Sequence, residues 1–404
     1  MDLESMAVSE SSENKMSERN FGQDLAFLNS HVETIVLRNA EGAEIVLVPD
    51  YQGRTMTSTS QGADGTSYGY INYSAISSDI HDPQINLYGG EDRMWISPEG
   101  GQYSVFFDPD VEMSYANWRT PACLDSEPFE LVKQDECSAS FSRQATLVNW
   151  SKTEFAVKMD REVVLLGREV ASQYLGVSLV GLRFVAHESR NTLTNQGEVS
   201  WASETGLIGI WMLCMNKPSP GSTLLVPFKQ GPVESLGPVV NADYFGKLDE
   251  TRLLVDESQG LIYFLGDGKM RSKLGLSYQR VQPWLGSWDK NRGVLSVVQF
   301  NLPESAPEGY NNNLWELQDE PYSGDVINGY NDGPNESGGQ LGGFFELETI
   351  SPALSLGPGE SYTHVHRTVR MEGDRAALSE VAESVFGVSL DEIESKFGEV
   401  PPPT

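Results

Sequence analysis

The stretch FFELETISPALSLGPGESYTHVHRTVRM, residues 344–371, contains two pairs of ionisable residues with the same spacing. A single residue separates Glu346 from Glu348, and a single residue separates His364 from His366. In a β-strand, residues i and i+2 point to the same face, so each pair is expected to lie on one side of a strand. The segment between the pairs is rich in Pro, Gly and Ser, which favours a turn. The sequence therefore predicts two strands whose paired carboxylates and imidazoles lie side by side.

The same β-rich pattern runs through most of the chain. Short apolar runs such as AEIVLVPD (43–50), QYSVFF (102–107), TLLVPF (223–228) and VLSVVQFNL (294–302) are separated by Gly, Asp, Asn and Pro. Helical periodicity is almost absent before residue 373, and no fixed repeat emerges that would indicate a propeller or a solenoid. We therefore expect an all-β fold, built as one large antiparallel architecture.

The two ends of the chain differ from this β-rich body. Residues 1–18 are rich in Ser and Glu and are expected to be disordered, and residues 19–372 form the predicted β domain. Apolar residues recur at helical spacing in residues 373–404, where Ser389 and Glu392 have the spacing of a capping box. We expect two short helices there, which cap the β domain.

Charge excludes several classes of partner. The chain has 404 residues, with 28 Lys and Arg against 58 Asp and Glu, and a formal net charge of −30. Such a charge repels phosphate backbones and anionic lipids, so we expect neither a nucleic acid nor a membrane as partner. A small neutral molecule such as a sugar remains compatible with this charge.

The cysteines and the N-terminal segment provide evidence about the cellular compartment of the protein. The three cysteines, Cys123, Cys137 and Cys214, are an odd number without CxxC spacing, which favours reduced thiols and leaves one bridge between the first two open. No apolar run is long enough to span a bilayer, and the first residues lack the apolar core of a signal peptide. The chain as given is expected in the cytoplasm, and in the periplasm or outside the cell if a signal has been removed.

Three further stretches combine polar and aromatic residues in the way that sugar sites do, because amides and carboxylates bond hydroxyls while aromatic rings stack on pyranose faces. YGGEDRMWISPEGGQYSVFF (88–107) and YNNNLWELQDEPYSGDVINGYNDGP (310–334) are expected to be loops at a site, the first equally well an ion-paired loop beside a core Trp. In NTLTNQGEVSWASETGLIGIWMLCMN (191–216), the Trp residues are expected in the core, and the carboxylate of Glu204 is a candidate for substrate binding. The candidate substrate-binding residues from these stretches are Glu91, Arg93, Trp95, Glu204, Asn313, Trp315, Glu316 and Tyr330.

Several of these motifs resemble those of a known superfamily. The order Leu-Glu-Thr (347–349), a short connection, and Leu-Gly-Pro-Gly-Glu (356–360) is similar to the C-terminal signature of aldose 1-epimerases, which are galactose mutarotase-like proteins. The Thr-Asn-Gln-Gly turn (194–197) is similar as well, and the loop GGEDRMW…PEGG resembles an uncharacterised bacterial branch of that superfamily. The resemblance implies one β-supersandwich over about residues 20–372 and a small carbohydrate as ligand, without a cofactor.

The resemblance also implies a role for one residue. In aldose 1-epimerases the Glu of Leu-Glu-Thr is the general base that removes the proton of the anomeric hydroxyl, and this role is carried onto Glu348. The family's acid is a His after the Asn-x-Gly turn, and this chain has none there. We therefore expect the acid to be His364, His366, Glu204 or a residue of the loop Glu91–Arg93. If Glu346 shares a face with Glu348, like-charge repulsion should raise the pKa of one of them, which suits a base near neutral pH.

Two alternatives stay open at this point. The protein could bind a sugar without transforming it, because the expected His is missing. It could also be a cupin-like metal enzyme that holds Mn, Fe or Zn with His364, His366 and Glu346 or Glu348, although the spacing of the cupin motif is not met.

Overall fold

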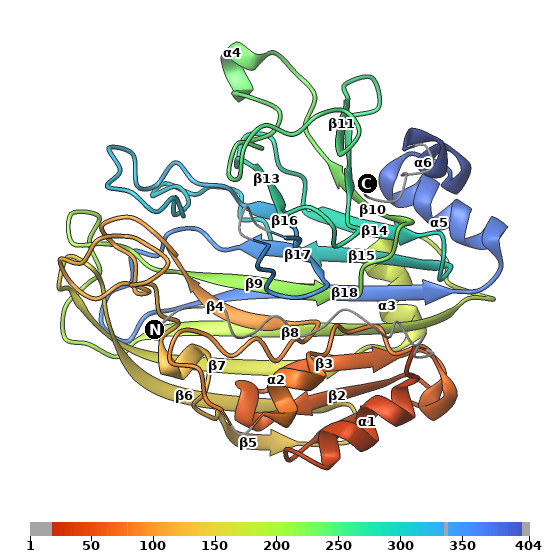
Figure 1. The fold of residues 1–404 in the computed structure, drawn as a ribbon, viewed down its shortest axis with the longest axis horizontal. Coiled ribbons are helices and arrows are strands. Elements are labelled where there is room, and N and C mark those ends of the chain that lie inside the picture. Colours follow the sequence, from red (N-terminus) through yellow and green to blue (C-terminus); the bar gives the residue numbers. More distant parts are fainter. Residues whose placement is uncertain (1–17, 79, 335–337, 398–404) are drawn as a thin grey trace.

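The computed structural model describes residues 18–78, 80–334 and 338–397, so the predicted disorder of residues 1–17 lies outside the described residues. In these ranges the chain is mainly antiparallel β-structure, with short helices at its C-terminal end, which confirms the predicted fold class (Figure 1). The division at residues 18 and 372 stays a prediction. All three cysteines are free thiols.

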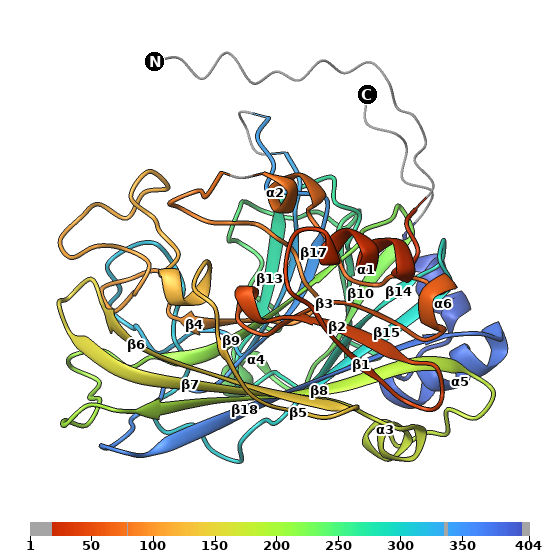
Figure 2. The same cartoon turned by 90° about the horizontal axis from the view of Figure 1, so that it is seen from below.

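The larger sheet of the described chain has ten strands and forms one layer of the molecule. Figure 2 shows its long central strands curving beneath the other elements. In spatial order, its strands are β11 (Leu253–Asp256), β12 (Leu261–Leu265), β10 (Ser222–Pro227), β14 (Trp284–Asp289), β15 (Val294–Phe300), β18 (Ser361–Glu372), β8 (Arg183–Asn195), β7 (Glu154–Leu165), β6 (Ser138–Val148) and β5 (Glu130–Gln134).

A five-stranded sheet packs on this layer, and a three-stranded sheet lies beside them. The five-stranded sheet has the order β13 (Ser272–Leu276), β16 (Ile327–Asn331), β17 (Phe345–Ile350), β9 (Gly209–Asn216) and β4 (Arg93–Ser97). The three-stranded sheet is formed by β1 (Ile35–Arg38), β2 (Glu44–Val48) and β3 (Arg54–Thr59).

The helices are short and peripheral. They are α1 (Phe21–Asn29), α2 (Tyr73–Ser77), α3 (Arg168–Leu175), α4 (Val233–Leu236), α5 (Arg375–Phe386) and α6 (Leu390–Lys396), with 3₁₀ turns η2 (Pro49–Tyr51), η3 (Gly62–Asp64) and η4 (Ala122–Leu124). The predicted C-terminal pair is confirmed: Ser389 and Glu392 form the capping box of α6. The buried residues Leu378, Phe386 and Ile393 pack both helices onto the large sheet in one apolar cluster.

Two expectations about local structure are wrong. Helices α1 and α3 occur before residue 373, and α1 begins with its own capping box, formed by Asn20 and Gln23. The run QYSVFF (102–107) is not a strand but a series of turns with one isolated bridge at Phe107. Its apolar side chains are buried in the main core, so burial and not strand pairing explains its composition.

Strands β17 and β18, which contain the two ionisable pairs, belong to different sheets. β17 pairs with β16 and β9, whereas β18 pairs with β15 and β8. The expectation that the two pairs lie side by side is therefore wrong. Because side chains alternate along a strand, Glu346 and Glu348 lie on one face of β17 and Thr349 lies on the other, toward β18.

Candidate functional site

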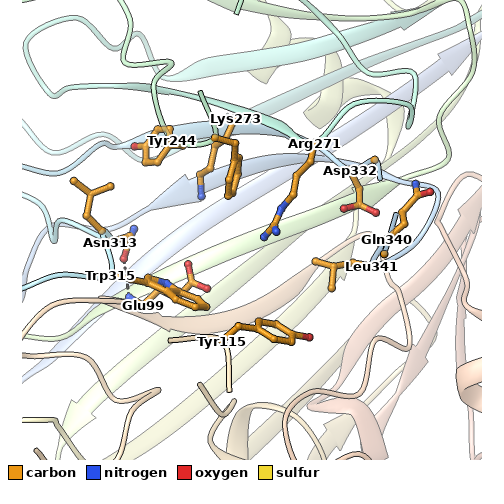
Figure 3. Close-up of a pocket in the computed structure, with 14 residues that line it drawn as sticks. Glu99, Tyr115, Tyr244, Arg271, Lys273, Asn313, Trp315, Asp332, Gln340 and Leu341 are labelled. Carbon is orange, nitrogen blue, oxygen red and sulfur yellow. Dashed lines mark hydrogen bonds between the residues drawn. The ribbon is translucent and has the colours of Figure 1, made fainter. Parts of the chain in front are cut away.

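A cavity of about 680 Å³ lies at the five-stranded sheet (Figure 3). Its lining residue Lys273 forms an ion pair with Glu348, which places the cavity next to the face that presents the two glutamates. Strand ends and loops from distant parts of the chain form its walls. The lining residues are Glu99, Tyr115, Tyr244, Phe245, Arg271, Lys273, Asn313, Leu314, Trp315, Asp332, Gly333, Gly339, Gln340 and Leu341.

Glu348 lies beneath this cavity and is held by two donors. Its Oε2 accepts a hydrogen bond from the indole Nε1 of Trp211 at 2.9 Å and an ion pair from Nζ of Lys273 at 3.3 Å. The ammonium of Lys273 also lies over the rings of Trp211 and Tyr244, at 5.0 and 5.5 Å from their centres. Oε1 of Glu348 makes no hydrogen bond with any residue that the structure describes, so one oxygen remains available to a ligand.

Glu346 lies on the same face of β17, as the alternation predicts. It pairs with Arg93 of β4, whose NH2 is 3.0 Å from its Oε1, and both side chains are almost fully buried. Burial raises the pKa of Glu346 to about 7, against the lowering effect of Arg93, and the charge of Glu348 adds to the rise. The expected like-charge effect is thus present, but burial is the larger cause.

Glu99 lines the cavity and is a second carboxyl whose pKa is raised toward neutrality. Burial raises its pKa to about 7; Lys273 opposes the rise, and Glu348 adds to it. Its position is fixed from the neighbouring loop, because the backbone N–H of Glu99 donates to Oδ1 of Asn313 at 2.8 Å. A carboxyl with such a pKa can donate a proton at physiological pH.

Two lining residues, Tyr244 and Asp332, belong to hydrogen-bonded pairs of a carboxyl group and a tyrosine hydroxyl. The hydroxyl of Tyr244 donates to Asp325, and burial raises the pKa of that aspartate to about 6. The hydroxyl of Tyr330 donates to Oδ1 of Asp332 at 2.7 Å, and burial raises the pKa of Asp332 as well. The cavity therefore combines proton donors and acceptors with aromatic surface.

The predicted substrate-binding residues fall into three groups. Asn313 and Trp315 line the cavity. Arg93, Trp95 and Tyr330 are buried beneath it, where the guanidinium of Arg93 lies 4.3 Å from the centre of the Trp95 ring.

The remaining three do not line the cavity. Glu204 and Glu316 lie on exposed loops. Glu91 is buried, and its carboxylate accepts bonds from Ser58 at 2.9 Å and from Arg370 of β18 at 2.8 Å. Its function is therefore to link two layers of the protein, and the prediction of a contact with ligand does not fit this position.

The two predicted histidines lie on the other side of β17. Thr349 Oγ1 is 2.8 Å from Nε2 of His364 and 2.9 Å from Nδ1 of His366, and both rings are fully buried. The backbone of β17 separates them from Glu346 and Glu348. The prediction that either histidine acts as acid opposite Glu348 is therefore wrong, because the two strands stack face to face instead of pairing edge to edge.

The same geometry bears on the metal hypothesis. Within residues 18–78, 80–334 and 338–397, no group of three or more His, Cys, Asp and Glu side chains is arranged to hold a metal ion. His364 and His366 face Thr349, whereas Glu346 and Glu348 point away from them. The set required by the cupin-like hypothesis is not assembled.

Sequence reasoning missed the basic side chains of the site. Arg271 and Lys273 occur in the stretch MRSKLGL (270–276), with the same i, i+2 spacing as the glutamates. Two cations on one face of a strand that is otherwise apolar were the available signal. Glu99 was visible between two glycine pairs, but nothing in its neighbourhood indicated that it meets residues of β13.

Among the described residues, no helix has the length and apolar character needed to cross a membrane. A comparison with functionally curated proteins finds no match.

Solved structures that are similar to this chain include two from the superfamily that the sequence motifs resemble. One is a protein of Escherichia coli K12 provisionally assigned as an aldose 1-epimerase, with 13% identity, a TM-score of 0.49, and coverage of 85% of this chain and 99% of that one. The other is a galactose mutarotase-like protein of Lactobacillus casei ATCC 334, with 9% identity, a TM-score of 0.48, and coverage of 84% and 100%. At the level of sequence families, a model matches residues 19–397, and the chain thus belongs to DUF6786, a family of unknown function.

Proposed function

We propose that the protein binds a sugar in the cavity and catalyses an epimerase-like proton transfer on it, with Glu348 as base and Glu99 as acid. The observation that carries the proposal is that Glu99, whose pKa burial raises to about 7, lines the cavity, while Glu348 lies beneath it and is held by an ammonium and an indole. A carboxyl with a raised pKa and a carboxylate fixed by two donors are the kinds of group that paired acid and base catalysis uses.

The walls of the cavity favour a sugar as ligand. Trp315 and Tyr115 provide aromatic surface, and both rings stack on Trp118, at centroid distances of 6.0 and 6.3 Å. Asn313 and Gln340 provide amides at the same cavity. Aromatic rings pair with the C–H faces of a pyranose, and amides and carboxylates pair with its hydroxyls.

The proposed chemistry balances without a cofactor. Glu348 removes the proton of the anomeric hydroxyl while Glu99 donates a proton to the ring oxygen, and the bond between C1 and that oxygen breaks. The open aldehyde rotates about the C1–C2 bond. On ring closure O5 attacks C1 and gives its proton back to Glu99, while Glu348 gives its proton back to O1. This step forms the other anomer and restores both carboxyl groups to their starting states.

Lys273 and Trp211 are assigned to positioning. Both bond to Oε2 of Glu348, which leaves Oε1 to accept the sugar's proton. Their donors also balance the negative charge of the carboxylate, which a buried base needs between turnovers.

A non-catalytic sugar-binding protein is the second candidate. Glu348 is only 1% exposed, so a ligand can reach it only at the bottom of the cavity. A sugar bound higher in the cavity would not contact the proposed base and would leave unchanged. The two candidates share the cavity and differ in whether the ligand is changed.

Anomer exchange measured by proton NMR tests the proposal, with a panel of neutral and acidic sugars as substrates. We expect wild type to accelerate exchange of at least one sugar, and Glu348→Gln to lose about 10²- to 10⁴-fold of that acceleration, as is typical when a general base is removed. Glu316→Gln, on an exposed loop, is the matched control and should keep the wild-type rate. Binding without acceleration would favour the second candidate, and an unchanged rate in Glu348→Gln would exclude that residue as the base.

A further inference from the structure

Arg271 has an unusual position for an arginine of this protein. It lies one residue before β13, and its Cζ is 4.4 Å from the centre of the Phe245 ring at the cavity wall. In Figure 3 its guanidinium is directed toward the middle of the cavity, beside the side chain of Lys273. The charged end of Arg271 is therefore presented to whatever occupies the site.

Three other cations around the cavity and in the core form ion pairs with carboxylates, whereas the buried Arg54 and Arg280 donate to carbonyl and amide oxygens. Lys273 bonds to Glu348, Arg93 to Glu346, and Arg252 to Asp267 with two bonds of 2.7 and 2.8 Å.

Arg271 makes no hydrogen bond or ion pair with the residues that the structure describes, and its Nε is buried without a partner. In a chain with a formal charge of −30, carboxylates are abundant, so an unpaired guanidinium inside a concave site indicates an anion that arrives from outside.

We propose that Arg271 binds a carboxylate substituent of the sugar, so that the ligand is a uronic acid or a chain that ends in one. This inference rests on the proposed function, since it concerns the same cavity and names the class of sugar. A guanidinium presents its N–H groups as a planar fork that fits both oxygens of a carboxylate, while the pyranose ring of the ligand lies against the aromatic side of the cavity.

The charges of the cavity favour a single negative charge over a double one. Among the lining residues that the structure describes, the basic ones are Arg271 and Lys273, and Lys273 is already engaged by Glu348, so Arg271 is left to face the ligand. Glu99 and Asp332 also line the cavity, and both lie close enough to Arg271 to feel its charge. A phosphorylated sugar would bring nearly two charges toward these carboxyl groups with one guanidinium to balance them.

Isothermal titration calorimetry tests the inference with matched ligands. The probes are D-galacturonate, D-glucuronate, D-mannuronate and a trigalacturonate, the methyl esters of the three monosaccharides, the parent neutral sugars, and glucose 6-phosphate. The esters are close in shape to the acids but lack the charge. The protein variants are Arg271→Gln, Arg271→Lys, and the control Arg183→Gln at an exposed position of β8.

We expect at least one uronate to bind wild type roughly 10- to 100-fold more tightly than its methyl ester, as the loss of a charge-assisted hydrogen-bonded pair implies. Arg271→Gln should remove this preference, Arg271→Lys should restore part of it, and Arg183→Gln should keep it. Circular dichroism of each variant verifies that the fold is retained.

The outcomes separate this inference from the function on which it rests. Neutral sugars or esters that bind as tightly as the acids, with no effect of Arg271→Gln, would overturn the inference and leave the sugar site intact. Preference for glucose 6-phosphate would overturn the single-charge argument. Failure of every sugar to bind would overturn the sugar site itself, and the inference with it.

Discussion

The two ionisable pairs of residues 344–371 have the same spacing and opposite surroundings. Glu346 and Glu348 lie on the cavity side of β17, where Arg93, Trp211 and Lys273 bond to them. His364 and His366 lie between the sheets and share a single threonine hydroxyl as partner. The comparison teaches that i, i+2 spacing determines which residues share a face, while the packing of sheets determines what that face meets.

The two regions also shift pKa values in different ways. In the cavity, burial raises the pKa of Glu99 and Glu346 to about 7, so the proton is gained near neutral pH. Between the sheets, burial lowers the pKa of His364 to about 3 and that of His366 to about 4, so both rings stay neutral. Desolvation disfavours the charged form in both regions, so it raises the pKa of the carboxyl groups and lowers that of the imidazoles.

The largest effect is expected from removing the acid of the cavity. Glu99→Gln should lower the rate of anomer exchange by about 10²- to 10⁴-fold, because a glutamine cannot donate the proton to the ring oxygen. In wild type the rate should fall as pH rises through about 7, where Glu99 loses its proton. The rate of anomer exchange, measured by NMR as a function of pH for wild type and Glu99→Gln, checks both the loss in the variant and the decline above pH 7.

Glu204→Gln on an exposed loop is the control for this variant and should keep the wild-type profile. A wild-type rate that does not fall above pH 7 would contradict the assignment of Glu99 as acid.

The second-largest effect is expected at acidic pH, where the two histidines between the sheets, His364 and His366, should lower the free energy of unfolding. The pKa of His364 and His366 is lower in the folded state than the ordinary value of 6.5, so the unfolded chain binds more protons below that pH. The stability that the neutral rings contribute is therefore complete above about pH 6.5 and is lost as pH falls toward 4. At about 1.4 kcal/mol for each unit of pKa difference, we expect a decrease of a few kcal/mol in the free energy of unfolding.

Neighbouring charges act on the two imidazoles with opposite signs. Asp92 raises the pKa of both His364 and His366, whereas Arg161 and Arg370 lower that of His366. Glu346 contributes with the opposite sign, since its raised folded pKa adds stability as pH falls from 7 toward 4.5.

Urea unfolding of wild type and Glu346→Gln between pH 4 and 8 separates these contributions. As pH falls, the free energy of unfolding should decrease more steeply in Glu346→Gln than in wild type. Glu99 and Asp325 also have raised pKa values and add stability in acid, so a variant that lacks all three carboxyl groups, Glu99→Gln/Asp325→Asn/Glu346→Gln, is the decisive comparison. Equal stability of that variant at pH 4 and 7 would rule out a contribution from His364 and His366.

The smallest effect is expected from the hydroxyl that joins the two histidines. Thr349→Val keeps the shape of the side chain but leaves one nitrogen of each ring without its partner. A cost of about 1–3 kcal/mol in the free energy of unfolding is typical of such a loss. Anomer exchange should be unchanged in the folded protein, since Thr349 faces away from the cavity.

Thr146→Val, at an exposed position of β6, is the control variant and should change the free energy of unfolding by no more than about 0.5 kcal/mol. A loss of exchange in Thr349→Val at full stability would show that the two faces of β17 are coupled.

Local patterns were sufficient for much of the fold. Alternating runs and turn residues predicted the antiparallel strands, and the spacing of Ser389 and Glu392 predicted the start of α6. The capping signal of α1, from Asn20 and Gln23, was equally available in the sequence and was overlooked. QYSVFF misled because apolar residues of a buried loop have the composition of a strand.

The candidate site could be predicted only in part, for a physical reason. Asn313 and Trp315 were found because a loop rich in amides and aromatic residues is typical of sugar binding. Arg271 and Lys273 were missed because their proximity to Glu99 depends on contacts between segments about 170 residues apart, which no local pattern encodes.

The sequence by itself determined that the chain is β-rich and acidic, and that each ionisable pair occupies one face of a strand, because composition and backbone geometry act locally. Only the tertiary structure decided that β17 and β18 stack in different sheets, which placed the glutamates beneath a cavity and the histidines in the interior. That choice depends on which apolar faces bury one another, and burial then set the charge of each group.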